Sequence, residues 1–125
     1  QAGIYWIGTL DGIQKWQALA AAEAMTLVSH QENFGLVVAE ALSVGTPVLI
    51  SNKVNIWREV AETKAGYVSN DTEEGANELL SKWLNSSKSH RSKMRENARK
   101  TFSMYFDIQT STKRLIDTIK DCSII

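Results

Sequence analysis

The chain has 125 residues, 43% of them hydrophobic and 22% charged, and its 14 basic side chains balance 14 acidic ones. A chain of this length buries about two thirds of the surface that it exposes when unfolded, so a core needs neither disulfides nor a structural metal. Zero net charge argues against a nucleic-acid interface built on a basic field. The single cysteine, Cys122, rules out a disulfide framework and a zinc cluster and suits a reducing compartment.

Short apolar runs alternate with helical segments over residues 1–70, the pattern typical of parallel strands joined by crossover helices. The expected strands are 4–7, 25–28, 47–50 and 66–68, and the expected helices between them are 11–23, 35–44 and 56–62. Residues 71–125 show helical periodicity alone, with helices expected over 72–84, 89–102 and 107–121. The sequence therefore predicts an α/β fold, a Rossmann-like parallel sheet with flanking helices, followed by a helical tail.

Basic residues concentrate in one part of that tail. Residues 88–100 contain Lys88, Arg91, Lys93, Arg95, Arg99 and Lys100 against a single acid, Glu96. The simpler interpretation is the solvated face of an amphipathic helix. The alternative is contact with anionic lipid or with an acidic partner surface.

The segment 29–46 is the most informative for function, because it lies where a predicted strand ends and a helix begins. Open α/β sheets bind their ligands in that crevice. The first-turn amides of Gly35, Leu36 and Val37 have no intrahelical acceptor, so a phosphate could dock on them without a basic side chain. Gly35 has no Cβ, and a ligand can therefore approach the backbone closely.

Two carboxylates flank this helix tip. Glu32 precedes the helix, and Glu40 lies about 7.5 Å beyond Gly35 along the helix axis. A carboxylate accepts charge-assisted hydrogen bonds from paired hydroxyls, so the offset suits a nucleoside diphosphate sugar. Singly, each acid would be read as dipole compensation or as a surface residue. Together, with Gly35 between them, they favour a ligand site.

The E-x7-E spacing of Glu32 and Glu40, joined to Phe34-Gly35 and Gly45-Thr46-Pro47, resembles family 4 glycosyltransferases of the GT-B fold. The likeness extends from about residue 4 to residue 68 and more loosely to the end of the chain. In that family the motif belongs to the C-terminal, nucleotide-sugar-binding domain of a retaining enzyme.

The resemblance implies a role for each residue of the motif. Glu32 would be the catalytic residue that orients the donor sugar and steadies positive charge near its anomeric carbon. The implied substrate-binding residues are Asn33, Phe34, Gly35, Leu36, Val37 and Glu40, with Glu40 on the ribose hydroxyls and the amides of Leu36 and Val37 on the diphosphate. Asn33 stands where many members have glycine, and asparagine tolerates left-handed backbone better than most residues.

The resemblance also implies what this chain lacks. The family's domain ordinarily begins with two more strand and helix units, and an N-terminal domain binds the acceptor. We therefore expect residues 1–125 to be a single truncated domain, inactive alone, whose open strand edges favour self-association. We expect a cytoplasmic location, with peripheral contact of the full enzyme at the inner face of the membrane left open. The only small-molecule partner implied is the nucleotide sugar, with neither cofactor nor metal.

Two alternatives remain open at this point: a noncatalytic Rossmann-like interaction module, and a sugar-nucleotide epimerase of similar fold. A glycosidase is disfavoured, because its two carboxyl groups must face each other across about 5 to 9.5 Å of open cleft. The base, the sugar, the acceptor and the linkage do not follow from the sequence.

Overall fold

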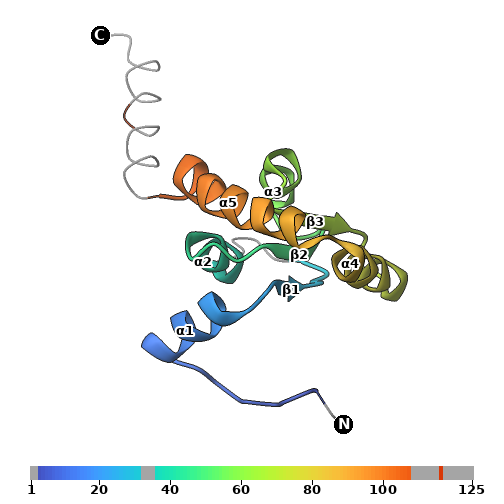
Figure 1. The fold of residues 1–125 in the computed structure, drawn as a ribbon, viewed down its shortest axis with the longest axis horizontal. Helices are drawn as coiled ribbons and strands as arrows, with labels where there is room; N and C mark the ends of the chain where they lie inside the picture. Colours follow the sequence, from blue (N-terminus) through green and yellow to red (C-terminus); the bar gives the residue numbers. More distant parts are fainter. Residues whose placement is uncertain (1–2, 32–35, 108–115, 117–125) are drawn as a thin grey trace.

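The computed structural model describes residues 3–31, 36–107 and 116. Figure 1 shows the order of the elements along the chain. They are α1 (Ile13–Ala21), β1 (Met25–Leu27), α2 (Leu36–Ser43), β2 (Val48–Ser51), α3 (Trp57–Thr63), β3 (Gly66–Ser69), α4 (Glu73–Asn85) and α5 (Lys88–Tyr105). Each agrees with a predicted strand or helix to within about three residues at either end.

The strands form a parallel sheet in the order β1, β2, β3. Val48 at the start of β2 pairs with Met25 of β1 and with Gly66 of β3. A helix, α2 or α3, lies in each connection between neighbouring strands, as parallel pairing requires. The predicted α/β class and Rossmann-like parallel sheet are confirmed.

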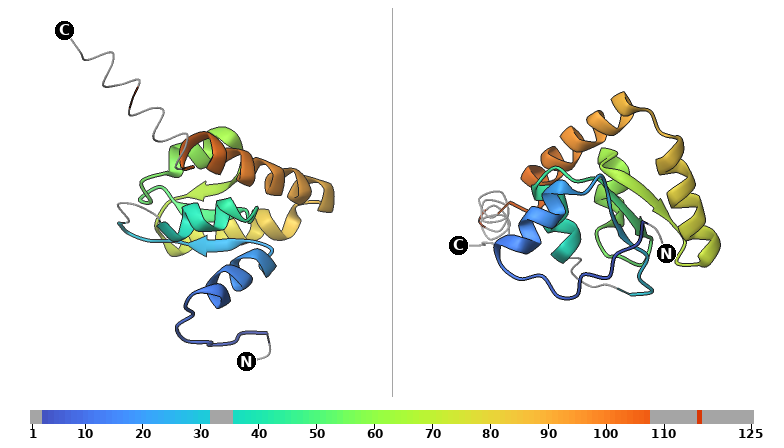
Figure 2. Two further views of the ribbon diagram at one scale, coloured as in Figure 1. Left: turned by 90° about the vertical axis from the view of Figure 1, so that its left-hand side faces the viewer. Right: turned by 60° about the horizontal axis from the view of Figure 1, so that its bottom comes forward.

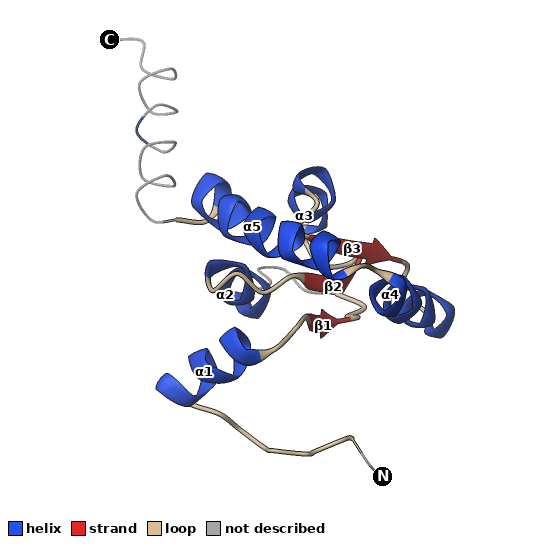
Figure 3. Cartoon of the chain, in the orientation of Figure 1, coloured by secondary structure: helices blue, strands red, loops and turns tan. Residues whose placement is uncertain are grey.

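Helices cover both faces of this sheet (Figure 3). Every residue of β2 is buried, and its side chains alternate between two clusters. Val48 and Ile50 pack with residues of α2 and α3, whereas Leu49 packs with Leu79 and Trp83 of α4. This double coverage explains why the strand is continuously apolar in the sequence.

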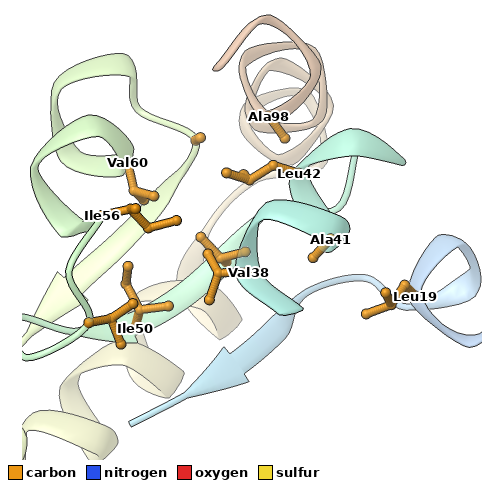
Figure 4. Packing of buried hydrophobic residues seen from close by; sticks show 11 residues of the cluster. Leu19, Val38, Ala41, Leu42, Ile50, Ile56, Val60 and Ala98 are labelled. Atoms are coloured by element: carbon orange, nitrogen blue, oxygen red, sulfur yellow. The ribbon is translucent and has the colours of Figure 1, made fainter. Parts of the chain in front are cut away.

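The larger core cluster lies between the sheet, α2, α3 and α5 (Figure 4). Val38 and Leu42 of α2, Val60 of α3 and Ala98 of α5 are all fully buried there. Helix α1 joins the cluster through Leu19, whose carbonyl oxygen also accepts a 2.6 Å hydrogen bond from the hydroxyl of Thr46.

Helix α5 runs past the amino-terminal ends of all three strands and contacts the residues just before each of them. Arg95 Nη2 donates to the carbonyl of Ala22 before β1 at 3.4 Å, Asn97 Nδ2 donates to that of Lys64 before β3 at 3.1 Å, and the Arg99 guanidinium lies against Gly45 before β2. The opposite, carboxyl-terminal edge of the sheet is where the predicted site lies.

Helix ends follow the signals in the sequence. Gly45, at φ 78°, ends α2 in the left-handed conformation, as its place before Pro47 predicts. Thr72 caps α4 by accepting a hydrogen bond from the Gly75 amide at 3.0 Å, and Ser87 caps α5 in the same way.

The prediction of a strand over residues 4–7 is wrong. The segment is extended but unpaired, and it lies away from the sheet (Figures 1 and 2). Ile4, Tyr5, Trp6 and Ile7 are 59%, 82%, 95% and 65% exposed. A strand needs a neighbour to complete its hydrogen-bond ladder, and within the described residues no strand lies beside this segment. The predicted helix over 107–121 falls outside the described residues except for Asp107 and Ile116.

None of the helices in the described part of the chain is both long enough and apolar enough to cross a membrane.

Candidate functional site

Polar residues follow each strand at the carboxyl-terminal edge of the sheet. Residues 29–31 come after β1, Asn52 and Lys53 after β2, and Asn70 and Asp71 after β3. Because the strands are parallel and adjacent, these three segments meet at one edge. Helix α2 begins at the same edge, since it follows β1 in the chain.

His30 and Asp71 join the outer two segments across the end of β2. His30 Nδ1 lies 2.9 Å from Asp71 Oδ2, and the His30 side chain is 85% exposed. This hydrogen bond is the main reason why the pKa of the Asp71 carboxyl is lowered, and the nearby positive charge of Lys53 acts in the same direction. The pair therefore places a carboxylate that stays ionised well below neutral pH at the strand ends.

Asn52 occupies the end of the central strand. Its backbone amide donates to Ser69 at 2.8 Å, and its side-chain Nδ2 donates to Asn70 Oδ1 at 3.3 Å. Its Oδ1 atom is buried and accepts no hydrogen bond from the described residues. Leaving a buried acceptor unpaired costs about 1–3 kcal/mol, so Asn52 Oδ1 is an uncompensated polar atom at the end of β2.

The first turn of α2 is open to solvent. Leu36 and Val37 are 69% and 37% exposed, whereas the next residue, Val38, is buried in the core. The amides of a first helical turn lack intrahelical acceptors and carry the positive end of the helix dipole. The exposed turn is therefore suited to an anion.

Glu40 is placed on α2 one turn beyond Leu36 and is mostly buried, with its side chain 15% exposed. Its Oε2 atom lies 2.7 Å from Lys15 Nζ of α1. This ion pair does not follow from the sequence, because the two residues are 25 positions apart in the chain. A carboxylate offers about four acceptor positions, so Lys15 fixes the side chain and leaves acceptor capacity for a ligand.

The structure thus places three of the predicted site residues, Leu36, Val37 and Glu40, on helix α2, which begins at the carboxyl-terminal edge. Glu32, Asn33, Phe34 and Gly35 lie outside the described residues, and their roles stay predictions. Asn52 and Asp71 were not predicted, although each lies within three residues of the end of a predicted strand, which is the signal that could have identified them. In the described part of the chain, no group of three or more His, Cys, Asp or Glu residues could hold a metal ion.

The chain is similar to known glycosyl transferases. The model of the family described as "Glycosyl transferases group 1" matches residues 1–101. The glycogen synthases of two Mycobacterium tuberculosis strains, CDC 1551 / Oshkosh and ATCC 25618 / H37Rv, are each 38% identical to this chain over 61 residues. The match covers 49% of this chain but only 15% of each relative. Since the family model matches most of the sequence, the chain belongs to the group 1 glycosyl transferases.

Proposed function

We propose that the chain is the donor-binding part of a retaining family 4 glycosyltransferase of the GT-B fold, which transfers a sugar from a nucleoside diphosphate sugar to an acceptor. The observation that carries the proposal is that α2 begins at the edge where the three parallel strands end, with an exposed first turn and Glu40 one turn further along the helix. Membership of the group 1 glycosyl transferases supports glycosyl transfer as the reaction.

The proposed diphosphate site is the first turn of α2. Amides of Leu36 and Val37 would donate to the diphosphate oxygens. Cleavage of the donor makes the departing diphosphate more negative, and fixed backbone dipoles stabilise that charge without reorganising. The ribose hydroxyls would bind the carboxylate of Glu40, held in place by Lys15.

The proposed sugar site is formed by residues 32–35 and the strand ends. In this proposal Glu32 orients the sugar and steadies positive charge near its anomeric carbon, while Asn33, Phe34 and Gly35 contact the sugar. The acceptor would bind to another part of a longer protein, and the chain alone would be inactive.

Titration followed by NMR tests this proposal. Uridine, guanosine and adenosine diphosphates and their sugars are added separately to the purified protein. We expect one base series to shift the amide resonances of Leu36, Val37 and Glu40 in a saturable way, with the sugar-bearing form also shifting Asn52. If no diphosphate or sugar shifts these resonances at millimolar concentration, the chain is better described as a noncatalytic module. If donor binds but a full-length enzyme yields a rearranged nucleotide sugar, the epimerase alternative holds.

A further inference from the structure

The basic residues of α5 do not form one uniform solvated face. Lys88, Arg91 and Arg95 follow one another at spacings of three and four residues, so they lie on the same side of the helix. Lys93 lies on another side, where its Nζ is 3.8 Å from Glu96 Oε2. The first turn of α5 contains no acidic residue, in contrast to that of α4. Lys88, Arg91 and Arg95 thus form a positive surface on one side of α5.

That part is a cavity of about 340 Å³ where α4 ends and α5 begins, beside the chain that leads into β1. It lies toward the amino-terminal edge of the sheet, opposite the candidate donor site. Its wall carries three cations, Lys88, Arg91 and Arg95, and one acid, Glu23. Trp83, Ser86 and Ser92 complete the lining.

Arg91 is already held in place on the wall of this cavity. Its Nε donates to Ser86 Oγ at 2.9 Å and its Nη2 donates to the carbonyl oxygen of Trp83 at 2.6 Å. The guanidinium also lies 4.6 Å from the centre of the Trp83 ring. Because the Arg91 side chain is already ordered, its contact with a ligand costs little side-chain entropy.

The other two cations retain most of their hydrogen-bonding capacity. Lys88 has no hydrogen bond or ion pair with any described side chain, and Arg95 makes a single long hydrogen bond of 3.4 Å to Ala22. Glu23 is the one acid on the cavity wall; it is 74% exposed and 4.0 Å from Arg91, so it neutralises the site only in part. The side chains of the wall carry a net charge of about +2 in a protein whose overall charge is zero.

We propose that this cavity is a second anion site that binds a phosphate monoester. A dianionic phosphate matches the excess positive charge, and its three terminal oxygens can accept charge-assisted hydrogen bonds from Lys88, Arg91 and Arg95. The volume lies within the range of small-molecule sites, which begins at about 300 Å³. The ester comes either from a soluble compound or from a lipid headgroup. The proposal is independent of donor binding at the carboxyl-terminal edge.

Calorimetric titration of the purified protein with inorganic phosphate and with glycerol 3-phosphate tests the site. We expect saturable binding of glycerol 3-phosphate that weakens at least about tenfold when Lys88→Gln and Arg95→Gln are combined. The matched control combines Lys93→Gln with Lys100→Gln, which removes the same charge from other sides of α5. It should change the dissociation constant by less than about twofold. The single Lys88→Gln variant, altered at an exposed side chain, serves as a second variant that should keep the fold.

Sedimentation with vesicles distinguishes the two sources of the ester. Vesicles containing phosphatidic acid, but not pure phosphatidylcholine vesicles, should carry the protein down if a headgroup is the ligand, and the Lys88/Arg95 variant should stay in solution. Binding of glycerol 3-phosphate with no effect of vesicles identifies a soluble ester. Equal weakening in both double variants would mean unspecific attraction to the basic helix and would overturn the proposal. If neither glycerol 3-phosphate nor phosphatidic acid vesicles bind the protein, the proposal is overturned as well.

Discussion

Replacing Glu40 with glutamine removes the charge of the proposed ribose contact with little change in side-chain shape. The Glu40 side chain is 15% exposed, and its Oε2 forms an ion pair with Lys15 Nζ at 2.7 Å. The substitution therefore has two effects, which can be measured separately: loss of hydrogen bonds to a ligand and loss of an ion pair within the protein.

The two effects differ in size. Hydrogen bonds to a charged group contribute about 1.5–3 kcal/mol, so the dissociation constant of the nucleoside diphosphate should rise roughly 10- to 150-fold. The Lys15 side chain is 37% exposed, and solvent screens the ion pair. Its loss should lower the free energy of unfolding by at most about 1 kcal/mol.

Isothermal titration calorimetry with the nucleoside diphosphate measures the first effect and urea denaturation the second. The control is Glu78→Gln on α4, which removes the same charge from an ion pair with Lys82 at 3.0 Å, on a side chain 54% exposed. That variant should bind as the parent does. If Glu40→Gln binds the diphosphate within twofold of the parent, or if both variants lose affinity equally, Glu40 is not the ribose contact.

Three further predictions concern the fold and the strand ends. Leu42→Ala should lower the free energy of unfolding in urea by about 2.7–5 kcal/mol, whereas Leu84→Ala, at a side chain 75% exposed, should change it by less than about 0.5 kcal/mol; equal effects would contradict the core assignment. Gly66→Ala would place a Cβ 1.8 Å from a β2 carbonyl oxygen, so it should lower the thermal midpoint more than Leu42→Ala does, and a parent-like midpoint would contradict the β2–β3 register. Carbon-13 NMR titration should find the Asp71 pKa below the ordinary aspartate value, and His30→Gln should raise it; an Asp71 pKa unchanged by His30→Gln would count against the contact. Because the pKa is lowered in the folded protein, the pair stabilises the fold above the unfolded pKa, and this stabilisation disappears as pH falls below about 4.

Local signals were sufficient for most of the fold. The apolar run 47–50 predicts a central strand because its residues are covered on both faces, and Gly45 predicts the end of α2 because its left-handed conformation suits glycine. The run 4–7 carries an equally strong strand signal, yet it is exposed and unpaired. Whether an apolar run becomes a strand depends on a neighbouring strand, which is not encoded in the run itself.

The candidate site was predictable to the extent that it depends on one helix. The tip of α2 and the place of Glu40 follow from helical geometry. The contacts of Glu40 with Lys15 and of His30 with Asp71 join residues 25 and 41 positions apart in the sequence, and they exist because separate elements pack together. No spacing rule within one segment predicts such pairs.

Donor binding at the carboxyl-terminal edge is tested most directly by a crystal structure of the protein with the nucleoside diphosphate that binds most tightly. We expect diphosphate oxygens within hydrogen-bond distance of the Leu36 and Val37 amides, and a ribose hydroxyl on the Glu40 carboxylate. A diphosphate bound at any other place, including the cavity between α4 and α5, with the first turn of α2 empty, would contradict it.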